Sequence, residues 1–212
     1  MQSLRNIFWL CAHGLGLLLA MFVTACATTE VTSIWKDPSY QGRPGKVMVI
    51  GVSKNPVNRR IFEDEFVQQL KARGADAIAS YTVLPDAKQN DQEVIAKKVA
   101  EQQADTVLIT RLVSKRTVQV YVPGTVYYPP VYYGTWRDYY GYGYQAIYTP
   151  GYIAEDEYAS IETNLYSAAN DKLIWAASSE TMMRGSDQKL INSYVGVMVK
   201  KMAEQGVLGK IK

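Results

Sequence analysis

Histidine and cysteine are nearly absent from this chain of 212 residues, which contains one histidine and two cysteines. The histidine, His13, and one cysteine, Cys11, lie within Asn6–Thr29, a stretch that also lacks Asp, Glu, Lys and Arg. If processing removes the chain before Cys26, the remainder keeps one cysteine and no histidine. Such a chain has no means of Ser-His-Asp or Cys-His catalysis, of metal binding through histidine, or of an internal disulfide.

A strong charge of either sign is missing as well. The formal net charge is +3, charged residues make up 20% of the chain and hydrophobic residues 48%. This balance excludes an intrinsically disordered polymer and is not typical of a protein that binds polyanions. The length predicts about one domain.

The N-terminal segment has the pattern of a secretory signal peptide. One positive charge, Arg5, precedes the apolar run Ile7–Phe22, and small residues follow that run. The alternative is an uncleaved membrane helix, because the 21 residues of Ile7–Ala27 would span ~31 Å. The small residues and the absence of a Lys or Arg before Glu30 favour the signal peptide, over residues 1–25.

The end of this segment, Val23-Thr24-Ala25-Cys26, resembles the bacterial lipobox. The resemblance implies cleavage between Ala25 and Cys26 and a diacylglycerol on the Cys26 thiol, with the membrane as a partner. In bacterial lipoproteins Asp after the cysteine favours retention in the inner membrane. The residue here is Ala27, which points to the outer membrane, with the protein facing the periplasm.

Residues 26–45 are expected to form the lipidated cysteine and a tether, with Val31–Trp35 as a short edge strand. Residues 46–212 are predicted to form a single α/β domain, a two-layer sandwich with a mixed sheet of about five strands and three helices. An antiparallel hairpin and a helix end this domain. The expected strands are Lys46–Val52, Ala75–Tyr81, Asp105–Val122, Tyr158–Ser167 and Leu173–Met183.

Capping residues predict where the helices begin. Asn55 with Pro56 starts the first helix, Asn90 with Glu93 forms a capping box, and Ser186 or Asp187 caps the last helix. The first helix is expected to bury Val57, Ile61, Phe66 and Leu70, to end at Gly74, and to pair Arg59 with Glu63 and Arg60 with Asp64 on its exposed face. Trp175, in the last strand, is expected to be buried.

Three short patterns resemble those of uncharacterised bacterial lipoproteins with a domain of unknown function. They are Trp35-x-Asp37-Pro38, Asn58-Arg59-Arg60 with Glu63, and Lys172-Leu173-Ile174-Trp175. That family implies no reaction. The order of strands and helices is also remotely similar to envelope lipoproteins and periplasmic domains that form assemblies, including the curli secretion channel.

Candidate chemistry elsewhere is sparse. Glu155-Asp156-Glu157 lacks the spacing of a calcium loop, and neighbours on a strand point to opposite faces. The loop before the first helix lacks the glycines of a phosphate loop, so an anion at Arg59 and Arg60 is the less favoured interpretation. Ser178, Ser179 and Thr181 have no general base at a recognisable spacing. We therefore expect no catalytic residue, metal or cofactor.

A tyrosine-rich insert, residues 123–156, is the unusual feature. Eleven of the 16 tyrosines lie between Tyr121 and Tyr152, and the only charges there are Arg137 and Asp138, which argues against nucleic acid as a partner. The insert is either a long loop over the sheet or a contact surface for proteins, glycans or lipid headgroups. Tyr127–Tyr148 is expected to be dispensable for folding. The candidate contact residues are Tyr127, Tyr128, Tyr132, Tyr133, Trp136, Tyr139, Tyr140, Tyr142 and Tyr144.

Three functions remain at this point. The favoured hypothesis is a non-enzymatic outer-membrane lipoprotein that binds an envelope protein or glycan, with self-association as a further possibility. The first alternative is a subunit of an oligomeric export or pore complex. The second, less favoured alternative is a hydrolase of envelope polymers, for which no acid/base pair is visible.

Overall fold

The computed structural model describes residues 29–126, 135, 137 and 148–208. The predicted cleavage and lipidation residues Ala25 and Cys26 lie outside this part of the chain. So do all nine predicted contact residues: Tyr127, Tyr128, Tyr132, Tyr133, Trp136, Tyr139, Tyr140, Tyr142 and Tyr144.

A six-stranded mixed sheet forms the centre of the domain, with the strand order β1-β8-β7-β4-β2-β3. β2 runs parallel to β3 and β4, and the pairs β4–β7, β7–β8 and β8–β1 are antiparallel. The strands are β1 (Thr29–Lys36), β2 (Lys46–Val52), β3 (Asp76–Ala79), β4 (Thr106–Val122), β7 (Tyr152–Ser167) and β8 (Leu173–Met182). Two short strands, β5 (Thr125–Val126) and β6 (Tyr148–Thr149), pair separately.

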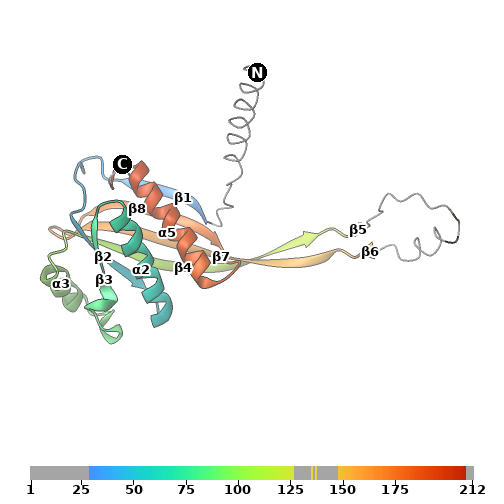
Figure 1. The fold of residues 1–212 in the computed structure, drawn as a ribbon, viewed down its shortest axis with the longest axis horizontal. Helices are drawn as coiled ribbons and strands as arrows, with labels where there is room; N and C mark the ends of the chain where they lie inside the picture. The colour runs from blue at the N-terminus through green and yellow to red at the C-terminus, as the bar shows by residue number, and fades with distance from the viewer. Residues whose placement is uncertain (1–28, 127–134, 136, 138–147, 209–212) are drawn as a thin grey trace, which may run out of the picture.

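Helices cover both faces of the sheet. α2 (Pro56–Ala72) and α5 (Asp187–Glu204) lie together on one face, over Val47, Leu108 and Trp175 (Figure 1). α3 (Gln92–Glu101) covers Met48 and Ile50 on the other face. Successive residues of a strand point to opposite faces, so β2 is apolar on both sides. The predicted α/β class, the mixed sheet, the three helices and the C-terminal hairpin with its helix are confirmed. The sheet has six strands rather than about five, because β1 joins it, and helices on both faces give three layers rather than the predicted two.

The helix ends follow from capping. The Asn55 side chain accepts hydrogen bonds from the N–H groups of Val57 and Asn58, and Pro56 takes the first helical position, where its missing N–H costs nothing. Gly74 has a φ of +81° and ends α2 as predicted. Two details differ from the prediction, because Val57 is exposed and the cap of α3 is Asp91 rather than Asn90.

Strand boundaries also differ from the sequence prediction. The edge strand expected at Val31–Trp35 covers Thr29–Lys36 and pairs with β8, so much of the predicted tether belongs to the sheet. β7 begins at Tyr152, six residues before the predicted start, and residues 152–156 are therefore strand rather than insert. Trp175 is fully buried, as expected.

The charged residues of α2 contradict the prediction of a solvated face. Arg59 and Glu63 are fully buried, with Arg59 Nε 2.9 Å from Glu63 Oε1. Arg59 also donates to Ser80 Oγ at 2.8 Å and to Asp86 Oδ1 at 2.6 Å. Arg60 contacts Asp86 instead of Asp64. The guanidinium is satisfied by protein groups, so it contributes to folding and not to an anion site.

Candidate functional site

A long arm leaves the domain where β4 and β7 run beyond their neighbours (Figure 1). These two strands pair continuously from Thr106 opposite Ser167 to Val122 opposite Tyr152, apart from a bulge between Leu112 and Ser114. β2 stops opposite Arg111, and β8 stops opposite Tyr158. Within the described residues the outer half of the pair is therefore a two-stranded ribbon with both edges open.

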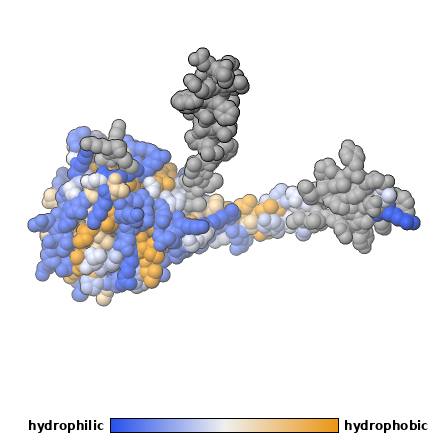
Figure 2. Space-filling view, viewed as in Figure 1, coloured by the Kyte–Doolittle hydropathy of each residue, from blue (hydrophilic) through white to orange (hydrophobic). Residues whose placement is uncertain are grey.

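The arm has one mainly apolar face and one mixed face. The alternation of β structure places Val118, Val120, Val122, Tyr152 and Ala154 on one side. Val120 is 44% and Tyr152 57% exposed. Apolar side chains are visible along the arm in Figure 2.

The opposite face carries Lys115, Thr117 and Gln119 from β4 near its base. At its outer end Tyr121 and Ile153 are opposite one another and are 68% and 63% exposed. Lys115 Nζ lies 3.4 Å from Glu157 Oε1, and Gln119 Nε2 donates to Glu155 Oε1 at 2.9 Å. The ribbon therefore exposes apolar side chains on both faces toward its outer end, and no other described element covers them.

Charged side chains fasten the base of the arm to β8 and to the loop that follows. Arg116 forms an ion pair with Glu180 at 2.8 Å, and its guanidinium lies over the Tyr158 ring. Arg184 pairs with Asp156. Hydrogen bonds to Arg116 lower the pKa of Glu180, and the bond to Asp156 raises the pKa of Arg184. The acidic run that includes Asp156 therefore binds cations of the chain itself.

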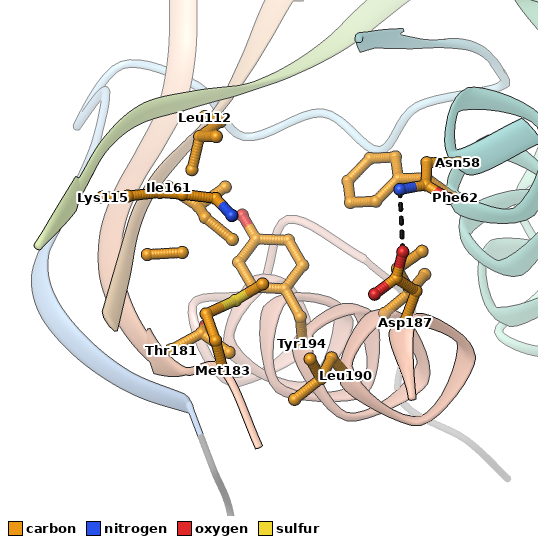
Figure 3. Close-up of a pocket in the computed structure, with 12 residues that line it drawn as sticks. Asn58, Phe62, Leu112, Lys115, Ile161, Thr181, Met183, Asp187, Leu190 and Tyr194 are labelled. Carbon is orange, nitrogen blue, oxygen red and sulfur yellow. Dashed lines mark hydrogen bonds between the residues drawn. The ribbon is translucent and has the colours of Figure 1, made fainter. Parts of the chain in front are cut away.

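A cavity of about 230 Å³ opens at the base of the arm, between the sheet and the helices α2 and α5 (Figure 3). Its walls are mainly apolar, and its polar members are Asn58, Lys115, Thr181, Asp187 and the Tyr194 hydroxyl. Asn58 Nδ2 donates to Asp187 Oδ2 at 3.0 Å, which ties α2 to α5. The apolar lining consists of Phe62, Leu112, Ala159, Ile161, Met183, Leu190, Ile191 and the Tyr194 ring.

Tyr194 forms the floor of this cavity. Its hydroxyl is hydrogen-bonded to Thr163, whose own hydroxyl lies 2.7 Å from that of Thr110. Burial raises the pKa of Tyr194, against the smaller opposing effect of these hydrogen bonds. The hydroxyl is neutral and satisfied, so the ring serves the cavity as an apolar wall.

The charged groups at the cavity have partners within the chain. The two charged groups at the cavity, Lys115 and Asp187, are engaged with Glu157 and Asn58 and do not face one another as an acid/base pair. No group of three or more His, Cys, Asp or Glu residues that would suit a metal ion occurs in the described part of the chain. Among the described helices, none is long and apolar enough to cross a membrane.

Sequence reasoning identified the aromatic segment but missed the ribbon and the cavity. The ribbon left a signal, since β4 alternates as far as Val122 and thereby requires an equally long partner. The cavity left none, because its lining comes from β4, β7, β8, α2 and α5 and no local pattern joins these elements.

Comparisons with known proteins concern the fold alone. No protein-family model matches this sequence, and no curated protein matches it either. The structure is similar to that of a PelC dodecamer from Paraburkholderia phytofirmans, at 15% identity and a TM-score of 0.47, over 86% of this chain and 99% of that one. It is also similar to lipoprotein GNA1162 from Neisseria meningitidis, at 15% identity and a TM-score of 0.41, over 76% and 99%.

Proposed function

We propose that this protein is a non-enzymatic lipoprotein of the outer membrane, anchored through Cys26 on the periplasmic side, and that it works as a binding or assembly module of the envelope. The observation that carries the proposal is the arm. It extends from a well-packed domain, leaves an apolar face uncovered and leads directly into the tyrosine-rich segment.

The physical argument begins with the stability of the ribbon. An isolated two-stranded ribbon is only marginally stable in water, and an apolar sheet face normally packs against another layer. Val120 and Tyr152 have no such layer in the described structure. A surface of this kind is typical of a contact with a second macromolecule, an envelope protein, a glycan or another copy of the chain. Tyrosine adds large and stiff contact area at the end of the arm.

Replacement of the arm's end tests this role. Val126 and Tyr148 are opposite one another in β5 and β6, so residues 127–147 can be replaced by Asn-Gly, which closes a two-residue hairpin. Tyr148 is kept because it belongs to β6, where it pairs with Val126. We expect the variant to fold, by circular dichroism, and to lose cross-linking to its envelope partner or to itself. A matched control replaces the same 21 residues with a Gly/Ser chain of equal length.

Two outcomes would contradict the proposal. Cross-linking that is unchanged in both variants would leave the arm without a contact role. Unfolding of both the Asn-Gly variant and the Gly/Ser control would assign residues 127–147 a role in the core of the protein.

The anchor requires a separate experiment. Cys26→Ser removes the only thiol of the lipobox, so incorporation of labelled palmitate should be abolished and the protein should leave the outer-membrane fraction. Cys11→Ser, in the apolar run of the signal peptide, is the matched control and should change neither result. Label that persists in the Cys26→Ser protein would contradict lipidation at this residue.

A second candidate function is a subunit of an oligomeric export or pore complex. The exposed apolar side chains on both faces of the arm favour it, because such ribbons can pack side by side around a common axis. The native mass of the detergent-solubilised protein separates the two candidates. A monomer or dimer supports a binding module, and a closed ring of many copies supports the export or pore subunit.

A further inference from the structure

The cavity at the base of the arm has walls suited to a flexible apolar chain. Phe62, Leu112, Ile161 and Leu190 line it from four different elements. Asn58 and Asp187 satisfy one another, and the Tyr194 hydroxyl is bonded to Thr163. The cavity therefore offers a ligand apolar area and few free polar groups.

The size and the opening narrow the class of ligand. At about 230 Å³ the cavity is larger than the ~150 Å³ of an engineered apolar cavity that binds benzene, so several methylene groups fit. Leu112 lies on its border and is 49% exposed, which leaves one side open to the surroundings. A linear chain that enters from outside fits this shape better than a molecule that must be fully enclosed.

The place where the described chain begins points to the occupant. The first residue of β1, Thr29, is opposite Thr181 in β8, and their hydroxyl oxygens are 2.9 Å apart. Thr181 itself lines the cavity. Cys26 precedes Thr29 by three residues, which span at most ~11 Å. A lipid on Cys26 is thus attached within a short distance of the cavity.

We infer that the cavity binds an acyl chain of the lipid carried by Cys26 of the same molecule. This inference rests on the proposed lipoprotein function and adds an intramolecular site to it. Burial of each methylene group in the cavity favours the bound state, as it does in a membrane. The other acyl chain of the diacylglycerol would stay in the membrane and hold the base of the arm close to its surface.

Photo-cross-linking of the full-length lipoprotein tests the site. Cells that produce the protein are fed palmitic acid with a diazirine in its chain, and incorporation at Cys26 is measured before irradiation. After irradiation, mass spectrometry should find the lipid joined to peptides that contain Leu112, Ile161 or Leu190.

A matched pair of variants keeps the result specific. Leu112→Lys places a charge at the cavity and should lower the yield of these cross-links about tenfold, the equivalent of ~1.4 kcal/mol. Val113→Lys is the control, since Val113 is the next residue, is 47% exposed and does not line the cavity. It should leave the yield unchanged. Circular dichroism of both variants checks that they are folded.

Three results would overturn the inference, and they are distinguishable. No incorporation of palmitate would contradict the lipoprotein function itself. Incorporation at Cys26 without cross-links at the cavity, or with cross-links that Leu112→Lys does not reduce, would contradict only the acyl site. Cross-links at the cavity in a Cys26→Ser protein supplied with the same fatty acid would assign the site to a free membrane lipid.

Discussion

At the scale of single residues, the buried guanidinium of Arg59 has the largest expected effect on stability. Arg59→Ala leaves the Glu63 carboxylate buried without its cation, so the free energy of unfolding should fall by ~3–5 kcal/mol. Arg60→Ala is the control. Arg60 is half-exposed and its ion pair with Asp86 is long, at 3.4 Å, so loss of this side chain should lower the free energy of unfolding by less than ~1 kcal/mol. Urea unfolding of both variants measures the difference, and similar losses would show that the burial of Arg59 contributes nothing.

Tyr194 gives a second prediction at this scale, a dependence on alkaline pH. Burial raises the pKa of its hydroxyl above the ordinary value near 10, so its contribution to stability is complete below pH ~10 and is lost as the pH rises, because only the unfolded chain releases the proton. The stability advantage of the wild type over Tyr194→Phe should shrink by ~1.4 kcal/mol between pH 8 and pH 11. Denaturant unfolding at the two pH values measures it. A constant difference would place the hydroxyl in contact with water.

The pair Arg59–Glu63 also shows what sequence reasoning resolves at this scale. The spacing of four residues predicts the ion pair correctly. It does not reveal the burial, since Ser80 and Asp86, which complete the network, follow 21 and 27 residues later in the chain. A local pattern contains no information on contacts of that separation.

At the scale of elements, the start of α3 is a direct test of the observed cap. The Asp91 side chain accepts a hydrogen bond from the N–H of Val94, so Asp91→Ala should cost ~1 kcal/mol. Asn90→Ala, at the residue that the sequence favoured, should stay within ~0.5 kcal/mol of the wild type. Thermal unfolding of the two variants ranks them, and the reverse order would restore Asn90 as the cap.

The strands show the same division between local and distant information. Alternation in β4 predicts its full length, but the first residues of β7 include Glu155-Asp156-Glu157, whose charges hide the strand pattern. Their pairing is decided by the register with β4, where Asp156 is opposite Val118. The helices were easier to place, because capping residues and the 3.6-residue period are local signals.

At the scale of the whole molecule, the limits of the folded domain differ from those that the sequence suggests. β1 is an edge strand that pairs with β8, Val31 packs against the hydrophobic core, and the Thr29 hydroxyl is hydrogen-bonded to that of Thr181. A chain that begins at Arg43 should therefore be less stable than one that begins at Ala27 and should aggregate through the exposed edge of β8. Thermal midpoints measure the difference in stability, and sedimentation measures the aggregation. Equal results for the two chains would show that residues 27–42 act as a tether and do not stabilise the domain.

The overall α/β class could be predicted from the sequence because each element carries its own periodicity. The arm and the cavity depend instead on how far two strands extend beyond the others and on where two helices begin above them. These are properties of the assembled molecule, and the long alternation of β4 as far as Val122 was the sign of the arm in the sequence.

The continuity of β4 and β7 has a mechanical consequence. Each strand runs without a break in the chain from the packed sheet into the arm. A force on the outer end of the pair is therefore transmitted to its inner end, which lies under α5. The bulge between Leu112 and Ser114 interrupts the regular ladder of hydrogen bonds. The arm would bend at this point, since bulges bend and twist a strand locally. A pull on the tip would concentrate torque at this point, which adjoins the cavity. Force on the arm would then alter the shape of the cavity, and a ligand in the cavity would alter how easily the arm bends.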